Sequence, residues 1–161
     1  MSNIVIFGGS GFIGLHFIEH LLIDKTFNYI YSIDIKEPLE AFRINQYEKL
    51  KKNKKIIFIK KDIRESLIEL NVKNVDLIVD FAAIHKEPGH NENEYYDTNV
   101  NGSKNICEFA KHVDCKNIIF TSSISVYGFG NHEKNESTEP NPSTPYGKSK
   151  LILEKNYLNW Q

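Results

Sequence analysis

The sequence has no excess of either charge and no long apolar run. Lys and Arg together number 20 and Asp and Glu number 21, which gives a net charge of −1. A chain without a basic surplus lacks the electrostatic basis for holding nucleic acid or an anionic membrane, so we expect neither partner. No apolar stretch approaches the ~20 residues of a membrane-spanning helix. The first residues lack a positively charged segment and a cleavage site, so we expect no signal peptide and a cytoplasmic protein.

Cysteines and histidines are few, and their spacing does not suit a disulfide framework or a metal site. Cys107 and Cys115 form no C-x-x-C pattern, so we expect two reduced thiols. His85 and His90 lie in a polar stretch, and His132 is not followed by the second histidine of a zinc-binding helix. The sequence therefore predicts no bound metal.

What is present fits one globular domain. The chain has 161 residues, of which 40% are hydrophobic and 25% are charged. These proportions argue against a disordered or fibrous chain. Because no internal repeat, low-complexity tract or linker is visible, we treat residues 1–161 as a single unit.

Apolar runs alternate with segments of helical spacing along the chain. The alternation predicts strands at 4–7, 29–34, 56–59, 77–81 and 118–120, and helices at 13–22, 39–52, 66–70, 95–112 and 145–160. Polar stretches at 85–94 and 128–145 are expected to be loops, and loops as long as the second are often functional. This order predicts an α/β fold of βαβ units with a parallel sheet.

A glycine-rich turn joins the first predicted strand to the first helix. Gly8 permits a tight turn, Gly11 lets the backbone approach a pyrophosphate, and Gly14 lets the helix pack close to the strand. The helix amino terminus would then offer N–H groups and a partial positive charge to the phosphates. The alternative is a glycine-rich turn without a ligand.

Asp34 ends the second predicted strand, 20 positions beyond Gly14. A carboxylate there accepts hydrogen bonds from the adenosine ribose hydroxyls and repels a 2′-phosphate, so we expect NAD in preference to NADP. The neighbouring Lys36 would soften that preference, and the alternative for Asp34 is a solvent-exposed side chain. Gly147-Lys148-Ser149 resembles the end of a nucleotide-binding P-loop, but Pro142 occupies the position of the required glycine.

Tyr146 and Lys150 lie four positions apart at the start of the last helix, so they share one face of it. Tyrosine has an ordinary pKa near ~10 and is a poor base at neutral pH. A neighbouring ammonium and a cationic nicotinamide ring would stabilise the phenolate. Ser123 follows the fifth strand at the sheet edge where α/β proteins bind ligands, so its hydroxyl could bond the reacting oxygen.

Taken together, these motifs resemble the extended short-chain dehydrogenase/reductases, in the NAD-dependent sugar-nucleotide epimerase/dehydratase branch. The matching segments keep the family's order and span nearly the whole chain: Gly8-Gly9-Ser10-Gly11-Phe12-Ile13-Gly14, Asp34, Asp62-Ile63-Arg64, Phe81-Ala82-Ala83, residues 95–102, Ser122-Ser123, Val126-Tyr127-Gly128 and Tyr146-Gly147-Lys148-Ser149-Lys150. The resemblance implies a Rossmann-type, doubly wound parallel sheet of about five strands in the order 3-2-1-4-5.

The resemblance also implies roles for individual residues. Tyr146 would be the general acid/base, Lys150 would hold the nicotinamide ribose, and Ser123 would orient the substrate hydroxyl. The remaining cofactor-binding candidates are Gly8, Gly11, Phe12, Ile13, Gly14, Asp34, Asp62, Ile63, Phe81, Ala82, Ala83, His85 and Asn99. For Asn99 the alternative is a helix-interior residue bonded to nearby backbone, and for His85 it is a plain loop residue.

One departure from the family narrows the implied chemistry. Dehydratase members carry an Asp-Glu pair directly after the catalytic Ser or Thr, whereas this chain has Ile124 and Ser125. We therefore expect epimerisation of a nucleotide sugar by transient hydride transfer to NAD. The alternatives are an NAD(P)-dependent reductase of another carbonyl compound and a non-catalytic nucleotide-sensing module.

The resemblance implies that family members continue beyond the position of Gln161. Members carry a sixth strand and a carboxyl-terminal substrate domain after the helix that holds the Tyr and Lys. We therefore expect residues 1–161 to be an incomplete NAD-binding domain that turns over a nucleotide sugar poorly by itself. The resemblance also implies a homodimer formed through the helices at 95–112 and 145–160.

Overall fold

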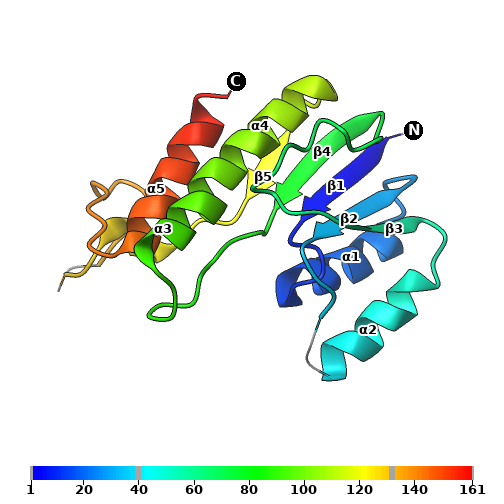
Figure 1. Ribbon diagram of the computed structural model, residues 1–161, viewed down its shortest axis with the longest axis horizontal. Helices are drawn as coiled ribbons and strands as arrows, with labels where there is room; N and C mark the ends of the chain where they lie inside the picture. Colours follow the sequence, from blue (N-terminus) through cyan, green and yellow to red (C-terminus); the bar gives the residue numbers. More distant parts are fainter. Residues whose placement is uncertain (1, 39–40, 131–132, 161) are drawn as a thin grey trace.

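In the computed structural model the chain forms a five-stranded parallel sheet with helices on both faces (Figure 1). The structure describes residues 2–38, 41–130 and 133–160. The strands are β1 (Asn3–Phe7), β2 (Ile30–Asp34), β3 (Ile56–Lys60), β4 (Val75–Asp80) and β5 (Ile118–Phe120). They lie in the order β3-β2-β1-β4-β5, and every neighbouring pair is parallel. This is the predicted order, so the Rossmann-type fold is confirmed.

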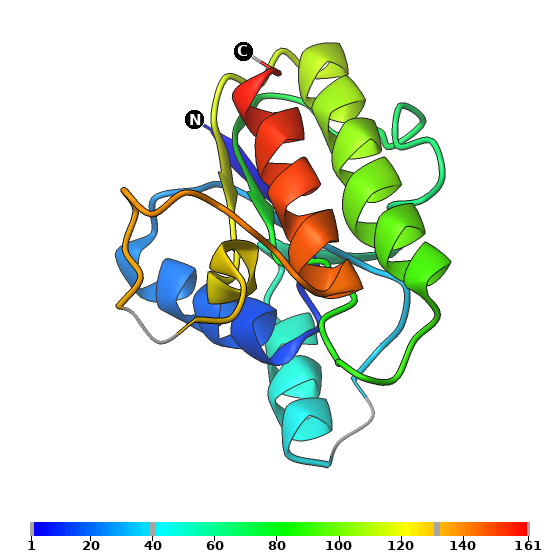
Figure 2. The same ribbon diagram turned by 90° about the vertical axis from the view of Figure 1, so that its left-hand side faces the viewer.

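The helices cover the sheet in two layers. They are α1 (Phe12–Asp24), α2 (Ala41–Lys51), α3 (Glu92–Tyr95), η1 (Tyr96–Asn101), α4 (Gly102–His112), η2 (Ile124–Tyr127) and α5 (Pro145–Leu158). α1 and α2 lie on one face, and α4 and α5 lie side by side on the other (Figures 1 and 2). Among the described residues, no helix is both long enough and apolar enough to cross a membrane.

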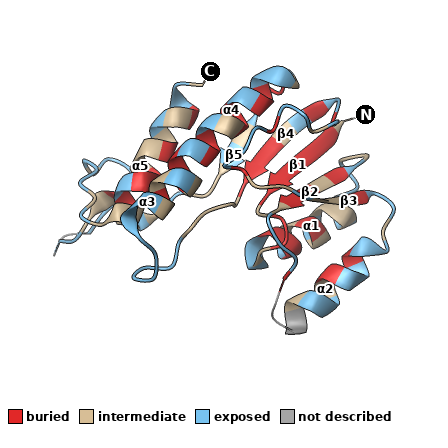
Figure 3. Ribbon diagram, in the orientation of Figure 1, coloured by how far each residue is buried: buried red, intermediate tan, exposed pale blue. Residues whose placement is uncertain are grey.

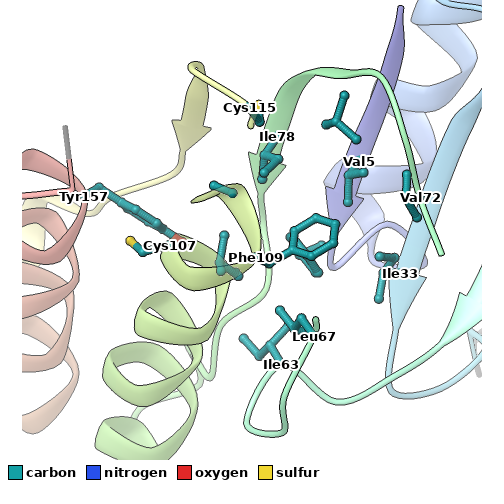
Figure 4. Close-up of a cluster of buried hydrophobic side chains, with 14 of the residues drawn as sticks. Val5, Ile33, Ile63, Leu67, Val72, Ile78, Cys107, Phe109, Cys115 and Tyr157 are labelled. Carbon is teal, nitrogen blue, oxygen red and sulfur yellow. The ribbon is translucent and has the colours of Figure 1, made fainter. Parts of the chain in front are cut away.

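The central strand β1 is buried along its whole length because both of its faces are covered (Figure 3). Ile4 and Ile6 point into the cluster that includes residues of α1 and α2. Val5 and Phe7 point into the opposite cluster, in which Figure 4 labels Val5 and Phe109. The Phe7 ring meets the Phe109 ring of α4 edge-on at a centroid distance of 5.8 Å. Burial on both faces explains why the strand is a continuous apolar run rather than an alternating one.

The helix predicted over 95–112 has a more complex form. Its path is helical from Glu92 to His112, but η1 is a π-helical segment between α3 and α4. A π-helical turn widens the backbone, and such turns are frequent at functional sites. Asn99, one of the predicted cofactor residues, lies within η1 and is fully buried.

The short helix predicted over 66–70 is wrong. These residues form turns, in which the Leu70 amide donates to the Leu67 carbonyl oxygen. Leu67 itself is 1% exposed and packs in the core, so the apolar spacing reflects an anchored turn. The helix predicted over 39–52 is confirmed from Ala41 to Lys51, and residues 39–40 lie outside the described part of the chain.

Candidate functional site

The glycine loop sits where the carboxyl ends of β1 and β4 meet. Gly8 has a φ of +76°, a backbone conformation that favours glycine. A Cβ at this position would lie 2.7 Å from the Ala82 nitrogen and from the Phe81 carbonyl carbon. Gly8 is therefore required both by the turn and by the close approach to the chain leaving β4. This contact brings the phosphate-loop candidates against the predicted Phe81-Ala82-Ala83 segment.

Two further glycines shape the start of α1. A Cβ at Gly14 would lie 2.5 Å from the Gly8 carbonyl oxygen, so the helix packs directly on the turn. A Cβ at Gly11 would meet only the Gly8 oxygen, at 3.2 Å, and otherwise faces open space. Gly11 is also the N-cap, and no side-chain hydrogen bond caps the helix. The amino terminus of α1 is thus open to an anion, and Phe12 and Ile13 in its first turn are exposed.

Asp34 lies beside this loop at the end of β2. The Ser10 N–H donates to Oδ2 of Asp34 at 3.0 Å, and the Ile35 N–H donates to Oδ1 at 2.8 Å. Burial raises the pKa of Asp34, and the backbone hydrogen bonds partly offset that rise. The bond from Ser10 ties the glycine loop to the carboxylate predicted to bind the adenosine ribose.

Gly9 also belongs to this loop, and sequence reasoning assigned it no role. A Cβ there would lie 2.2 Å from Oγ of Ser32, which is 1% exposed. That hydroxyl is buried without a hydrogen-bond partner in the structure. The loop therefore rests directly on β2.

Asp62 and Ile63, the residues predicted to border the adenine, have different surroundings. Arg64 binds Asp62 through both Nε and Nη2, with a shortest distance of 2.6 Å, and holds the pKa of Asp62 below its ordinary value. A hollow of about 390 Å³ lies beside this pair. Ile63 is 5% exposed and packs in the core, and its carbonyl oxygen accepts a hydrogen bond from Asn105 Nδ2 at 2.8 Å. The side chain of Ile63 therefore shapes the core rather than the surface of the hollow.

The segment after β4 carries four predicted cofactor residues. Phe81 continues the strand, and its N–H donates to the Phe7 carbonyl oxygen at 2.9 Å. Phe81, Ala82 and Ala83 are half-buried at the same edge of the sheet as the glycine loop. His85 is exposed in the loop that follows. The structure thus brings Phe81 and Ala82 against the glycine loop, with Ala83 next along the chain, and leaves His85 on the surface.

Ser123 follows β5 at the start of η2, and Tyr146 lies in the first turn of α5; close backbone packing brings η2 and α5 together. Ser123 is the N-cap of η2, where its hydroxyl oxygen accepts from the Ser125 N–H at 3.2 Å. A Cβ at Gly147 would lie 2.4 Å from the Ser125 carbonyl oxygen, so the first turn of α5 lies directly against η2. Tyr146 is half-buried, and its ring centroid lies 6.2 Å from that of Tyr95.

Lys150 lies one turn after Tyr146 on α5 and is only 2% exposed. Burial lowers the pKa of its ammonium, while the carboxylates of Asp80 and Glu154 act in the opposite direction. Glu154 also accepts a short hydrogen bond from the Ser122 hydroxyl, which joins α5 to the end of β5. The Lys150 side chain is therefore buried within reach of the charge of the buried Asp80 carboxylate.

Asn99 is occupied by contacts within the chain. Its side-chain oxygen accepts from the Ile84 N–H at 2.9 Å, and its amide donates to the Ile84 carbonyl at 3.1 Å and to the Ser149 hydroxyl at 2.9 Å. These bonds join the loop after β4 to α5 next to Lys150. Asn99 is thus a buried helix residue bonded within the chain, as the alternative for it expected. Its partners Ile84 and Ser149, however, are distant in sequence rather than nearby in the same helix.

Asp80 and Tyr157 are not among the residues predicted from the sequence. Asp80 ends β4 and is 3% exposed, and its carboxylate accepts from the Tyr157 hydroxyl at 2.6 Å. Ser149, which bonds Asn99, was also missed as an internal contact. The available signal was a single carboxylate, Asp80, within the otherwise apolar run 77–81, a position that the fold buries.

In the described part of the chain, the features away from this edge are a surface hollow and buried thiols rather than a cluster of site candidates. A larger hollow of about 520 Å³ lies between residues 68–74 and 112–114, at the amino-terminal edge of the sheet. Within residues 2–38, 41–130 and 133–160, no group of three or more His, Cys, Asp or Glu is placed to hold a metal ion. His132 lies outside the described residues. Cys107 and Cys115 are free buried thiols, and burial raises the pKa of Cys107 to about 11.

Comparison of the sequence with known families gives a match over residues 4–161 to the "NAD dependent epimerase/dehydratase family". The chain is 31% identical over 160 residues to N-acetyl-alpha-D-glucosaminyl-diphospho-ditrans,octacis-undecaprenol 4-epimerase of Escherichia coli O157:H7, covering 99% of this chain and 44% of that protein. It is 33% identical over 165 residues to UDP-glucose 4-epimerase of Neisseria meningitidis serogroup C, covering 96% of this chain and 47% of that protein. The chain thus spans about half the length of the curated relatives it matches.

Solved structures show the same fold. UDP-glucuronic acid 4-epimerase from Bacillus cereus, in complex with NAD, superposes with a TM-score of 0.83 at 28% sequence identity. The match covers 98% of this chain and 52% of that chain.

Proposed function

The chain belongs to the NAD dependent epimerase/dehydratase family, and from this premise we propose that residues 1–161 form an NAD-binding domain of a nucleotide-sugar epimerase. NAD, the cofactor predicted from the sequence, is the one that the family description names. One observation carries the proposal. The glycine loop, Asp34, Ser123, Tyr146 and Lys150 all come to the carboxyl-terminal edge of one parallel sheet, where such folds bind ligands.

The residues at this edge fit a dinucleotide. The open space at Gly11 leaves room for a pyrophosphate beside the amino terminus of α1. Asp34, which the Ser10 N–H bond ties to the loop, would accept hydrogen bonds from the adenosine ribose. The chain leaving β4 at Phe81 and Ala82 borders the same space. These groups would hold NAD across the end of the sheet.

Bound NAD supplies a nicotinamide ring that accepts and returns a hydride. The chain supplies the proton transfer, because Tyr146 would take the proton from a sugar hydroxyl and later return it to the ketone oxygen. Lys150 would hold the nicotinamide ribose and favour the phenolate form of Tyr146 through its charge. Ser123 would hold the reacting sugar oxygen with its hydroxyl. Return of the hydride to the opposite face of the sugar carbon inverts its configuration.

The residues after Ser123 support epimerisation over water elimination. Elimination needs an additional acid and base, whereas Ile124 is an apolar side chain that is 84% exposed. The backbone N–H of Ser125 is used within η2, where it donates to Ser123. A carboxyl pair is therefore missing from the positions where the dehydratase members carry it.

A nucleotide-sugar panel tests the proposal in the intact gene product. With catalytic NAD, a UDP-sugar should be converted to its 4-epimer with no net accumulation of NADH. Steady accumulation or consumption of NADH with another carbonyl compound would identify a reductase instead. Binding of NAD without conversion of any substrate would favour the nucleotide-sensing module.

Replacing Asp34 with asparagine should reduce the preference for NAD over NADP. The carboxylate repels a 2′-phosphate, and its loss leaves Lys36 as the nearest charged side chain in sequence. We expect the ratio of NAD to NADP affinity to fall by about tenfold, since the loss of one charged hydrogen bond is worth ~1.5 kcal/mol. Calorimetric titration of the wild-type chain and of Asp34→Asn with NAD and with NADP measures the ratio. An unchanged ratio would remove Asp34 from the proposed ribose site.

A homodimer through α4 and α5 remains part of the proposal. These helices lie side by side and share an outer face (Figure 2). Leu158 of α5 is a large apolar side chain that is 76% exposed, so a second copy of the chain could cover it. Sedimentation velocity at increasing protein concentration should show a dimer, and a monomer at all concentrations would refute this part of the proposal.

A further inference from the structure

Asp80 is a carboxylate buried at the junction of three elements. It is the last residue of β4 and is 3% exposed. Its Oδ1 accepts from the Ala82 N–H at 2.9 Å, and its Oδ2 accepts from the Tyr157 hydroxyl at 2.6 Å. Its backbone oxygen accepts from the Thr121 N–H at 3.2 Å. One residue therefore joins the chain leaving β4, the end of β5 and the helix α5.

Tyr157, which bonds Asp80, lies on the same helix as Lys150. The two residues are seven positions apart on α5, two helical turns, so both project toward the sheet. Tyr157 is 5% exposed, and its ring lies 4.8 Å from the Phe120 ring of β5. Figure 4 shows Tyr157 reaching inward from α5 beside Cys107. A bond from Asp80 to this side chain consequently limits how α5 can move against the sheet.

We propose that Asp80 is a positioning residue for the reaction, which holds α5 against the sheet through Tyr157 and sets a buried carboxylate to act on the buried Lys150 side chain. The inference rests on the proposed function, in which Lys150 holds the nicotinamide ribose and stabilises the phenolate of Tyr146. Asp80 would act on the reaction only through Lys150 and the placement of α5.

The charged groups around Asp80 and Lys150 support this role of Asp80. The groups that act on Asp80 are Lys150 and Tyr157 of α5, and Cys107 of α4 also feels its charge. Burial raises the pKa of Asp80 to about 6, and Tyr157, Lys150 and the Ala82 amide act to lower it. The carboxylate is therefore ionised at neutral pH. Of the two carboxylates that raise the Lys150 pKa, Asp80 has the larger effect and Glu154 the smaller.

The pH dependence has a definite sign. Above pH 6 the ionised Asp80 opposes the lowering of the Lys150 pKa that burial causes. As the pH falls through about 6, Asp80 takes up a proton and Lys150 loses this charge. Because the pKa of Asp80 is raised in the folded state, the folded chain binds this proton more tightly than the unfolded chain does. The free energy of unfolding therefore gains from Asp80 as the pH falls from 6 toward 3.8.

Proton titration by NMR of the 161-residue chain tests the pair without NAD or turnover. With ¹³C-labelled lysine and aspartate, the Asp80 carboxyl should titrate near pH 6, and the Lys150 Cε signal should shift with the same midpoint. Asp80→Asn keeps the size of the side chain but removes the charge. We expect it to abolish that shift and to lower the Lys150 pKa, because the negative charge that opposes the effect of burial is lost.

Two matched variants separate charge from packing. Tyr157→Phe removes the hydroxyl but keeps the Asp80 charge, so the coupled shift at Lys150 should persist. Glu154→Gln removes the second carboxylate and should change the Lys150 pKa less than Asp80→Asn does. If Asp80→Asn does not fold, the wild-type titration decides alone, because a Lys150 signal that is flat while Asp80 titrates overturns the proposal.

Calorimetry with NAD on the same samples keeps the two proposals apart. Independent titration of Asp80 and Lys150 in a chain that binds NAD overturns the role of Asp80 and leaves the proposed function in place. Coupled titration in a chain that does not bind NAD overturns the proposed function, and the positioning role falls with it. Coupled titration together with NAD binding is the expected result.

Discussion

Replacing Tyr146 with phenylalanine is expected to lower turnover of a nucleotide sugar by about 100- to 10,000-fold, the range for loss of a general acid/base. The substitution removes one hydroxyl from a half-buried ring and leaves Lys150 in place. We therefore expect NAD affinity to change by less than about threefold, because the ring still packs beside Tyr95. Initial rates of 4-epimerisation in the intact gene product, together with calorimetric NAD binding, measure the two quantities.

Tyr95→Phe is the matched control for this experiment. Tyr95 lies next to Tyr146, but its hydroxyl donates to the Lys86 carbonyl oxygen at 2.7 Å. Its removal should cost stability of about 1 kcal/mol and little turnover. Equal rates for wild type and Tyr146→Phe, or an equal loss in both variants, would contradict the assignment of Tyr146.

Alanine at Gly8 is expected to lower the stability of the fold, whereas alanine at Gly11 is expected to leave stability nearly unchanged and to weaken NAD binding. At Gly8, alanine must adopt a φ of +76° and place its Cβ 2.7 Å from the backbone of Ala82. The strain and the clash should together cost about 3 kcal/mol or more, which lowers the melting temperature by roughly 6–12 °C. At Gly11, φ is −71° and the added Cβ meets only one oxygen, at 3.2 Å, so folding should change by less than about 1 kcal/mol.

The Gly11 variant should instead lose NAD affinity by at least about tenfold, because its methyl group enters the space proposed for the pyrophosphate. Thermal unfolding and NAD titration of both variants test the pair of expectations. A Gly11→Ala chain that binds NAD as well as wild type would show that the pyrophosphate does not approach this position. A Gly8→Ala chain of unchanged stability would contradict the strain argument.

The sheet could be predicted from the sequence because its determinants are local. Each strand is a short apolar run, and runs such as Ile4–Phe7 must be buried on both faces, which requires helices in between. Right-handed crossovers then allow few arrangements of the strands. The glycine loop could also be predicted from the sequence, since only glycine meets the backbone requirements at Gly8 and Gly14.

The residues that support the site could not be predicted because their partners are distant in sequence. Asp80 and Tyr157 are separated by 77 positions, and Asn99 meets Ser149 across 50. Ile63 reads as part of an adenine-binding motif, yet its side chain packs against Gly102 in the core. The widened turn η1, which directs Asn99 toward Ile84, has no signal in the apolar spacing of its helix.

Titration of the 161-residue chain with NAD tests the central claim most directly. The account predicts saturable binding of one NAD per chain, with weaker binding of NADP because of Asp34. Circular dichroism on the same sample establishes that the chain is folded. A folded chain that gives no saturable heat with NAD would contradict the claim that this edge of the sheet is a dinucleotide site.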